Sequence, residues 1–141
     1  MKRTGSAVWK GGIRDGTGQV STESGVLSNE NYSFSKRFGD EPGTNPEELI
    51  GAAHAACFSM ALSAILGAAN MTPEEIGTSA AVTIAPDGGG FSITTVHLTV
   101  KARIPDADDS AFQKAAADAK AGCPVSKVLD AEITMDASLE S

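Results

Sequence analysis

The sequence predicts an α+β fold in which largely antiparallel sheets are wrapped around one long apolar helix. The central observation is a long run without Asp, Glu, Lys or Arg, at residues 49–69. Segments in which apolar and polar residues alternate lie before and after this run, and such alternation is typical of strands with one buried face. Strands and helices in this order, without a regular βα repeat, indicate the α+β class.

The N-terminal portion, about residues 5–38, is predicted to form short strands joined by turns. Residues 7–9 and 19–22 would be the strands of a hairpin, because Gly-Gly and Asp-Gly pairs lie between them. Residues 32–35 alternate like a third strand. This portion contains few apolar residues, so its sheet is expected to rest on another part of the protein.

The start of the central helix carries clear signals. Asn45 is a suitable N-cap, Pro46 fits the first helical position, and the two glutamates that follow place negative charge at the helix N-terminus. Asn70 follows the run and favours a left-handed terminator. The helix is therefore expected over about residues 46–69, with a length of about 35 Å at 1.5 Å per residue.

This helix is apolar on every side, so it is expected to be buried all round. Its length would suffice for a membrane span. However, Gly, Ala and Ser dominate it, His54 lies inside it, and acids rather than Lys or Arg flank it, which disfavours insertion into a membrane. A chain of 141 residues is too small to wrap such a helix completely, so we predict an obligate homodimer.

The C-terminal portion, about residues 78–141, is predicted to contain the second set of strands and helices. Along residues 91–104 apolar and polar side chains alternate, and a change of parity near Thr94 predicts a bulge. The predicted buried face of this strand consists of Val96, Leu98, Val100 and Ala102. The other predicted elements are a helical turn at 72–75, a strand at 80–84, helices at 109–121 and 124–129, and a strand at 133–139. Together these parts are expected to form one domain, residues 1–141.

Composition limits the classes of function. The net charge of −7 disfavours nucleic acid as a partner. The N-terminus has no apolar segment of the kind found in secretory signals, so we expect a cytoplasmic protein. In a reducing compartment, two cysteines are more often free or redox-active thiols than a structural disulfide.

The two cysteines are the first candidates for chemistry. Cys57 lies on the alanine-rich helix, where a cysteine can serve simply as a small apolar side chain. Cys123 lies at the predicted start of a helix, where the pKa of a thiol is lowered. The pair could therefore form a dithiol–disulfide couple. Zinc is a weaker alternative, because His54 lies three residues before Cys57 but no CxxC motif supports a metal site.

A reactive Cys57 would need a nearby cation, because burial raises the pKa of a thiol. Arg37 is the best candidate and Arg14 the second, while Glu47 would be a natural partner for such an arginine. Glu47 and Cys57 lie ten residues apart on one helix, which separates them by about 15 Å along its axis. Antiparallel pairing of two copies of this helix would bring Glu47 of one chain toward Cys57 of the other, at a two-fold interface.

Two motifs around the cysteines resemble those of a known family. Residues 45–59, NPEELIGAAHAACFS, closely resemble the signature of the OsmC/Ohr family of thiol peroxidases. Residues 121–129, AGCPVSKVL, resemble its second cysteine motif. The similarity extends through residues 20–27 and 36–38, and it is greatest to the OsmC (osmotically inducible protein C) branch.

This resemblance implies an intertwined homodimer with active sites at its interface. Cys57 would be the peroxidatic cysteine, which becomes a sulfenic acid, and Cys123 would resolve it as an intramolecular disulfide. Arg37 would stabilise the Cys57 thiolate and the leaving oxygen, and Glu47 would orient that arginine across the dimer. No metal, haem, flavin or other cofactor is implied. In the Ohr branch the arginine comes from a Gly-Gly-Arg-Asp-like segment, which residues 11–16 partly match, so Arg14 stays an alternative.

The predicted function is reduction of organic hydroperoxides, and of hydrogen peroxide less well, in oxidative or osmotic stress defence. The predicted reductant is a dithiol, of the lipoyl type or another thiol, and neither nucleic acid nor a membrane is expected as a partner. Two alternatives use the same cysteines differently. One is a redox sensor or binding protein without turnover, and the other is a structural dimer with inert buried cysteines.

Overall fold

The computed structural model describes residues 1–140 and divides into two compact units, Met1–Leu49 and Ile50–Ser141. The first unit contains a three-stranded sheet and a short helix. The second contains a separate three-stranded sheet and two helices. The long helix α2 (Pro46–Ala68) begins in the first unit and continues through the second. The α+β class predicted from the sequence is confirmed.

The sheet of the first unit is antiparallel, in the order β1 (Gly5–Lys10), β2 (Thr17–Thr22), β3 (Glu30–Tyr32). The rings of Trp9 and Tyr32 contact each other, with centroids 5.6 Å apart, although their strands are separated by β2. Gly18 makes this contact possible, because a Cβ atom there would lie 2.4 Å from the Tyr32 ring and 2.7 Å from the Trp9 ring.

The predicted third strand at residues 32–35 is wrong beyond its first residue. The chain instead forms helix α1 (Phe34–Phe38), and the Ser33 side chain caps it by accepting a hydrogen bond from the Lys36 backbone N–H. The alternation of polar and apolar residues suggested a strand. A serine that satisfies a free N–H of the first helical turn favours the helix.

The ends of α2 follow their sequence signals. The Asn45 side chain accepts a hydrogen bond of 2.8 Å from the Glu48 backbone N–H, which confirms the predicted N-cap. Asn70 has φ +59°, so it is the predicted left-handed terminator. The Met71 N–H then donates to the Leu66 carbonyl over 2.9 Å and closes the last turn.

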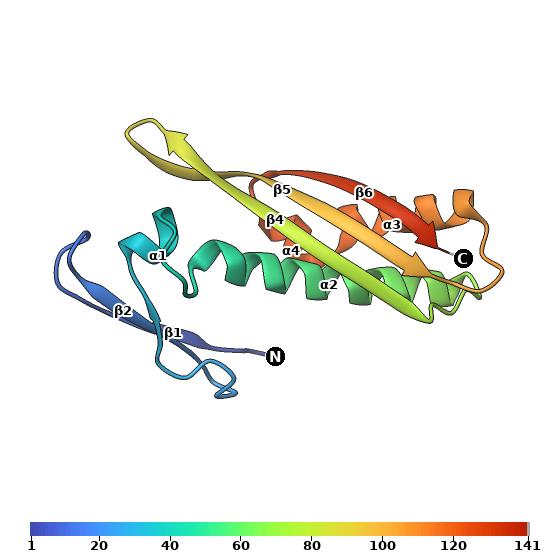
Figure 1. Ribbon diagram of the computed structural model, residues 1–141. Coiled ribbons are helices and arrows are strands. Elements are labelled where there is room, and N and C mark those ends of the chain that lie inside the picture. The colour runs from blue at the N-terminus through green and yellow to red at the C-terminus, as the bar shows by residue number, and fades with distance from the viewer. Residues whose placement is uncertain (141) are drawn as a thin grey trace. The chain divides into compact units, whose positions relative to one another are not determined.

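The sheet of the second unit has the order β4 (Glu75–Asp87), β5 (Gly90–Arg103), β6 (Glu132–Glu140). Strands β4 and β5 form an antiparallel hairpin, whereas β6 lies parallel to β5 and is reached through α3 (Asp109–Gly122) and α4 (Pro124–Val128) (Figure 1). A parallel neighbour requires such a crossover connection. The Asp108 side chain caps α3 by accepting from the Ala111 N–H.

Two local predictions for this unit have different outcomes. Thr83 pairs with Thr95 while Ile84 pairs with Ile93, so the predicted bulge at Thr94 is confirmed. The predicted helical turn at residues 72–75 is wrong. The Glu74 N–H donates to the Arg103 carbonyl over 2.8 Å, so this segment continues the strand pairing instead of coiling.

The core of the second unit lies between the β5 face, one stripe of α2 and one face of α3. The predicted inward positions of β5 are all buried. The main buried side chains are Val96, Leu98, Val100 and Ala102 of β5, Phe58, Leu62 and Leu66 of α2, and Phe112, Ala116 and Ala119 of α3. Gly51 allows close packing of α2 on β4, because a Cβ atom there would lie 2.8 Å from the Ala80 carbonyl oxygen.

One chain buries only part of α2. The stripe that includes Phe58 and Leu62 is fully buried, whereas Met60 between them is 77% exposed. Complete burial of the helix is therefore not achieved within one chain, because the sheet and α3 cover one side. By length and composition alone α2 could also cross a membrane, a test that the core helices of soluble proteins pass as well.

Candidate active site: a thiol pair and an arginine–glutamate pair

The second unit brings the two cysteines together. Cys57 projects from α2 and is half-buried, and Cys123 lies between α3 and α4 and is fully buried. Both are free thiols, and each shifts the pKa of the other. The Val125 backbone N–H also lies within hydrogen-bonding reach of the Cys57 sulfur. Two residues far apart in the sequence are thus neighbours in the fold.

Cys123 connects two helices. Its backbone N–H donates to the Ala119 carbonyl over 2.9 Å at the end of α3, and its side chain caps the start of α4. The sulfur accepts a hydrogen bond of 3.3 Å from the Ser126 backbone N–H, and Pro124 occupies the first turn. The predicted position of Cys123 at a helix start is confirmed.

The surroundings shift the pKa values of the two thiols in opposite directions. Burial raises the pKa of Cys57, and the Val125 N–H only partly opposes this. Burial also acts to raise the pKa of Cys123. Ser126, through its side chain and backbone, together with Cys57 and the Val125 backbone, outweighs this effect, so the net shift is downward. Within this unit Cys123 is therefore the stronger acid, and a Cys57 thiolate needs stabilisation from another positive group.

Ser126 and His54 lie next to the thiol pair. The Ser126 Oγ is 3.2 Å from the Cys123 sulfur and 2.7 Å from Nε2 of His54, which is fully buried on α2. Burial lowers the pKa of His54, so the imidazole is neutral near pH 7. From the sequence, His54 was predicted only as a weak zinc ligand, and Ser126 was not predicted as a site residue. Ser126 is the third residue after Cys123, and a helix cap binds the N–H at that position. This spacing was the signal that could have revealed Ser126.

No group of three potential metal-binding side chains occurs within residues 1–140, counting His, Cys, Asp and Glu. The hydrogen bond to Ser126 occupies Nε2 of His54. His54 thus belongs to a hydrogen-bonded cluster with a serine and a thiol.

The first unit holds the arginine and the glutamate that the sequence singled out. Arg37 projects from α1, and Glu47 lies in the first turn of α2. Arg37 Nη2 donates to Glu47 Oε1 over 2.7 Å, and Nε donates to both carboxylate oxygens over 3.1 and 3.2 Å. The Arg37 side chain is 37% exposed and that of Glu47 9%. The pair forms within one chain, and it leaves part of the guanidinium open.

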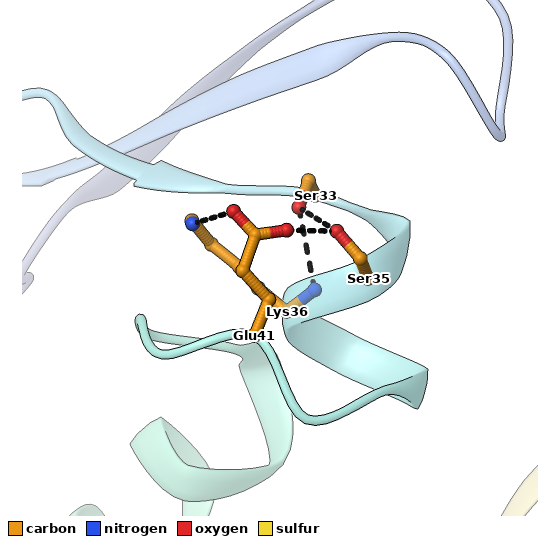
Figure 2. Close-up of polar contacts among 4 residues, drawn as sticks. All are labelled: Ser33, Ser35, Lys36 and Glu41. Carbon is orange, nitrogen blue, oxygen red and sulfur yellow. Dashed lines mark hydrogen bonds and ion pairs between the residues drawn. The ribbon is translucent and has the colours of Figure 1, made fainter.

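The loop between α1 and α2 is held against α1 by a second polar cluster, shown in Figure 2. The Glu41 carboxylate accepts hydrogen bonds from the Lys36 side chain, over 2.5 Å, and from the Ser35 hydroxyl. These bonds lower the pKa of Glu41, so it is ionised near neutral pH. The cluster closes the loop that joins the helices of Arg37 and Glu47, and thereby supports their pairing.

Arg14, the alternative arginine, has different surroundings. It lies exposed in the turn between β1 and β2, and its guanidinium stacks 4.6 Å from the centre of the Phe34 ring. Arg37 also contacts an aromatic ring, that of Phe38 at 5.1 Å, but it is in addition fixed by a carboxylate. Of the two arginines, Arg37 has the more defined orientation.

Comparisons with known proteins agree with these features. Residues 39–138 match the family described as OsmC-like protein. The peroxiredoxin OsmC of Escherichia coli is 55% identical over 141 residues, covering 100% of this chain and 99% of the relative. An organic hydroperoxide resistance protein of Xanthomonas axonopodis pv. citri is 31% identical over 98 residues, covering 69% of this chain and 67% of that protein.

A solved structure shows the same fold. The organic hydroperoxide resistance protein of Elizabethkingia anophelis superposes with a TM-score of 0.74 at 27% identity, and the match covers 99% of each chain. The family match and the full-length match to the Escherichia coli protein both include the segments that carry the two cysteines. The chain belongs to the OsmC-like family.

Proposed function

We propose that this chain reduces organic hydroperoxides with Cys57 as the peroxidatic thiol and Cys123 as the resolving thiol. The observation that carries the proposal is the pair of free, adjacent thiols, one on α2 and one capping α4. The 55% identity to a peroxiredoxin over the full chain supports a thiol-dependent peroxidase, and the organic hydroperoxide resistance relatives support the substrate class. A non-catalytic sensor has no comparable support.

The reaction proceeds in three steps. The Cys57 thiolate attacks the terminal oxygen of the hydroperoxide, the O–O bond breaks, and the alkoxide leaves as an alcohol after taking up a proton. Cys57 is then a sulfenic acid. The Cys123 sulfur attacks it, a disulfide forms and water leaves. An external dithiol reduces the disulfide by two exchange reactions and is itself oxidised.

Arg37 is proposed to supply the positive charge that the Cys57 thiolate needs. Burial raises the pKa of Cys57, so a thiolate requires a fixed cation. Arg37 is held by Glu47 with part of its guanidinium open, which suits stabilisation of the thiolate and of the leaving oxygen. Arg14 lacks such a carboxylate anchor and is the less suitable candidate.

The active form is proposed to be a homodimer in the cytoplasm. The open apolar face of α2, which includes Met60, supports a second copy as its cover. In that arrangement Arg37 and Glu47 of one copy serve the thiols of the other. The wild type should sediment as a dimer, and Met60→Glu should shift it toward the monomer because a buried carboxylate is costly. A wild type that stays monomeric at micromolar concentration would contradict this part.

Steady-state kinetics test the proposed activity. Purified protein should consume cumene hydroperoxide continuously with dihydrolipoamide as reductant, and hydrogen peroxide more slowly. Cys57→Ser should abolish turnover, whereas Cys123→Ser should accumulate a sulfenic acid that dimedone traps. Full activity of Cys57→Ser would refute the assignment, and consumption that stops near one equivalent would indicate a sensor instead.

A further inference from the structure

A continuous path of polar contacts leads from α2 to the sulfur of Cys123. Nε2 of His54 is 2.7 Å from the Ser126 Oγ, which is 3.2 Å from the Cys123 sulfur. The Ser126 backbone N–H also donates to this sulfur over 3.3 Å. The mechanism above names no residue that takes up the proton of the Cys123 thiol as its sulfur attacks. These contacts provide one.

The hydroxyl of Ser126 can take part in this path in two directions. When Cys123 is a thiol, its S–H can donate to Ser126 Oγ, while the Ser126 hydroxyl donates to His54 Nε2. When Cys123 is a thiolate, His54 Nε2–H can donate to Ser126 and the hydroxyl to the sulfur. Switching between the two arrangements moves one proton from the sulfur to the imidazole. Both fit the same atomic positions.

We propose that Ser126 and His54 form a proton relay that deprotonates Cys123 as it attacks the Cys57 sulfenic acid. Ser126 touches the reacting sulfur, whereas His54 acts through Ser126. The relay rests on the proposed function, since it requires Cys57 to form a sulfenic acid. It assigns to two residues a role in the second chemical step.

The step balances as follows. The Cys123 proton passes to Ser126 Oγ as the Ser126 proton passes to His54 Nε2. The Cys123 sulfur bonds to the Cys57 sulfur while the S–O bond of the sulfenic acid breaks. The imidazolium returns its proton through the half-buried Ser126 to the departing hydroxide, which leaves as water. The Cys123 sulfur is oxidised and the Cys57 sulfur is reduced, with no further reactant.

The surroundings of His54 keep the imidazole neutral before this step. The imidazole is completely buried, and its Nδ1 has no hydrogen-bond partner within residues 1–140. Burial lowers the pKa of His54, and no charged side chain among these residues contributes to the shift. The titratable groups that face it are the two thiols, Cys123 through Ser126 and Cys57 beside Cys123. The histidine therefore starts each cycle neutral, with a base available to the serine.

Single-turnover kinetics can separate this step from the peroxide reaction. Reduced protein is mixed with one equivalent of cumene hydroperoxide, and quenched samples are analysed by mass spectrometry for sulfenic acid, trapped with dimedone, and for disulfide. Ser126→Ala and His54→Gln should slow disulfide formation relative to sulfenic acid formation by about 100-fold or more, the usual contribution of a positioned base. Ser126→Thr keeps the hydroxyl, so it should restore the rate of disulfide formation relative to that of sulfenic acid formation.

A matched control and a pH profile distinguish the relay from a structural role. Ser59 also lies on α2 and forms a hydroxyl hydrogen bond of 2.8 Å, to Thr78, so Ser59→Ala should leave disulfide formation unchanged. In the wild type the rate of disulfide formation should fall as the pH drops below the ordinary range of histidine. His54→Gln should lack this inflection. A structural histidine would slow the step without removing the inflection.

Two results would overturn the relay. The first is a rate of disulfide formation within twofold of wild type in both Ser126→Ala and His54→Gln. The second is a rate in Ser126→Thr that does not exceed the rate in Ser126→Ala. If His54→Gln does not fold, the comparison of Ser126→Ala with Ser126→Thr alone decides. A wild type that forms no sulfenic acid would refute the proposed function itself, and the relay with it.

Discussion

The thiol pair and the Arg37–Glu47 pair are held in place by different forces. Cys57 and Cys123 are positioned by the apolar core of the second unit, against which both pack. Arg37 and Glu47 are positioned by charged hydrogen bonds in the first unit, with part of the arginine exposed. Core packing fixes the geometry of the thiols but raises the pKa of Cys57. Apolar packing therefore places the thiols, whereas ion pairing places the arginine.

The largest expected effect comes from breaking the packing around the thiols. Phe58→Ala should lower the free energy of unfolding by about 3–5 kcal/mol, because Phe58 is fully buried one residue after Cys57. Urea denaturation measures this. Val26→Ala, at a side chain that is 83% exposed, is the control and should change stability little. A small effect of Phe58→Ala would mean that the core does not position the thiols.

Removal of the charge should reduce both the rate and, to a smaller extent, the stability. Arg37→Met should lower kcat/KM for cumene hydroperoxide by about 100-fold or more, as expected for loss of a group that stabilises developing negative charge. Its unfolding free energy should fall by roughly 1–3 kcal/mol, because the buried Glu47 carboxylate loses its charged partner. Arg14→Met is the matched control. If it has the larger kinetic effect, Arg14 is the functional arginine.

The same variant should reverse the order in which the thiols ionise. In Arg37→Met, Cys123 should be alkylated by iodoacetamide at lower pH than Cys57, because hydrogen bonds from Ser126 lower the pKa of Cys123 while burial raises that of Cys57. In the wild type Cys57 should react first. Peptide mass spectrometry over a pH series gives the order. An unchanged order in the two proteins would show that Arg37 does not act on Cys57.

A smaller, pH-dependent effect is expected on stability. Burial lowers the pKa of His54, so as the pH falls below the ordinary value of 6.5 the unfolded chain binds a proton before the folded chain does. The contribution of the neutral histidine to the free energy of unfolding is therefore complete above pH 6.5. It is lost as the pH falls from 6.5 toward the lowered pKa of His54 in the folded chain. Thermal unfolding at pH 7.5 and pH 5 should show this loss. His54→Gln should show a smaller loss of stability between these two pH values.

The smallest effect should come from the loop cluster of the first unit. Glu41→Gln should weaken the bonds to Ser35 and Lys36 and lower kcat/KM less than Arg37→Met does, because Arg37 keeps its carboxylate. Stability should stay close to wild type, since Glu41 is exposed. Steady-state kinetics of Glu41→Gln and Arg37→Met, measured in parallel, rank the two losses of kcat/KM. An equal loss in both variants would mean that the loop determines the position of the arginine.

The features predicted best from the sequence depend on contacts between near neighbours. The Asn45 cap, the left-handed Asn70 and the alternation from Val96 to Ala102 follow from local rules, and the structure confirms each. The motifs around Cys57 and Cys123 predicted the family, and the comparisons confirm it.

The features that were missed depend on competition or on long-range contacts. Around Ser33 a strand-like alternation competes with a helix cap, and the cap prevails. The segment before β4 has helical start signals but pairs with the end of β5, far along the chain. The contact of His54 with Ser126 joins residues on α2 and α4 and has no local signature. Such contacts appear only when the fold is complete.

The parallel pairing of β6 with β5 has a consequence for the order of folding. Cys123 lies in the crossover between these strands, so its sulfur comes beside Cys57 only when that crossover is closed. Pairings between distant segments form slowly, because the entropy of closing a long loop is lost before their contacts form. The β4–β5 hairpin can form earlier. During refolding from denaturant, secondary structure should therefore recover before the capacity to form the Cys57–Cys123 disulfide.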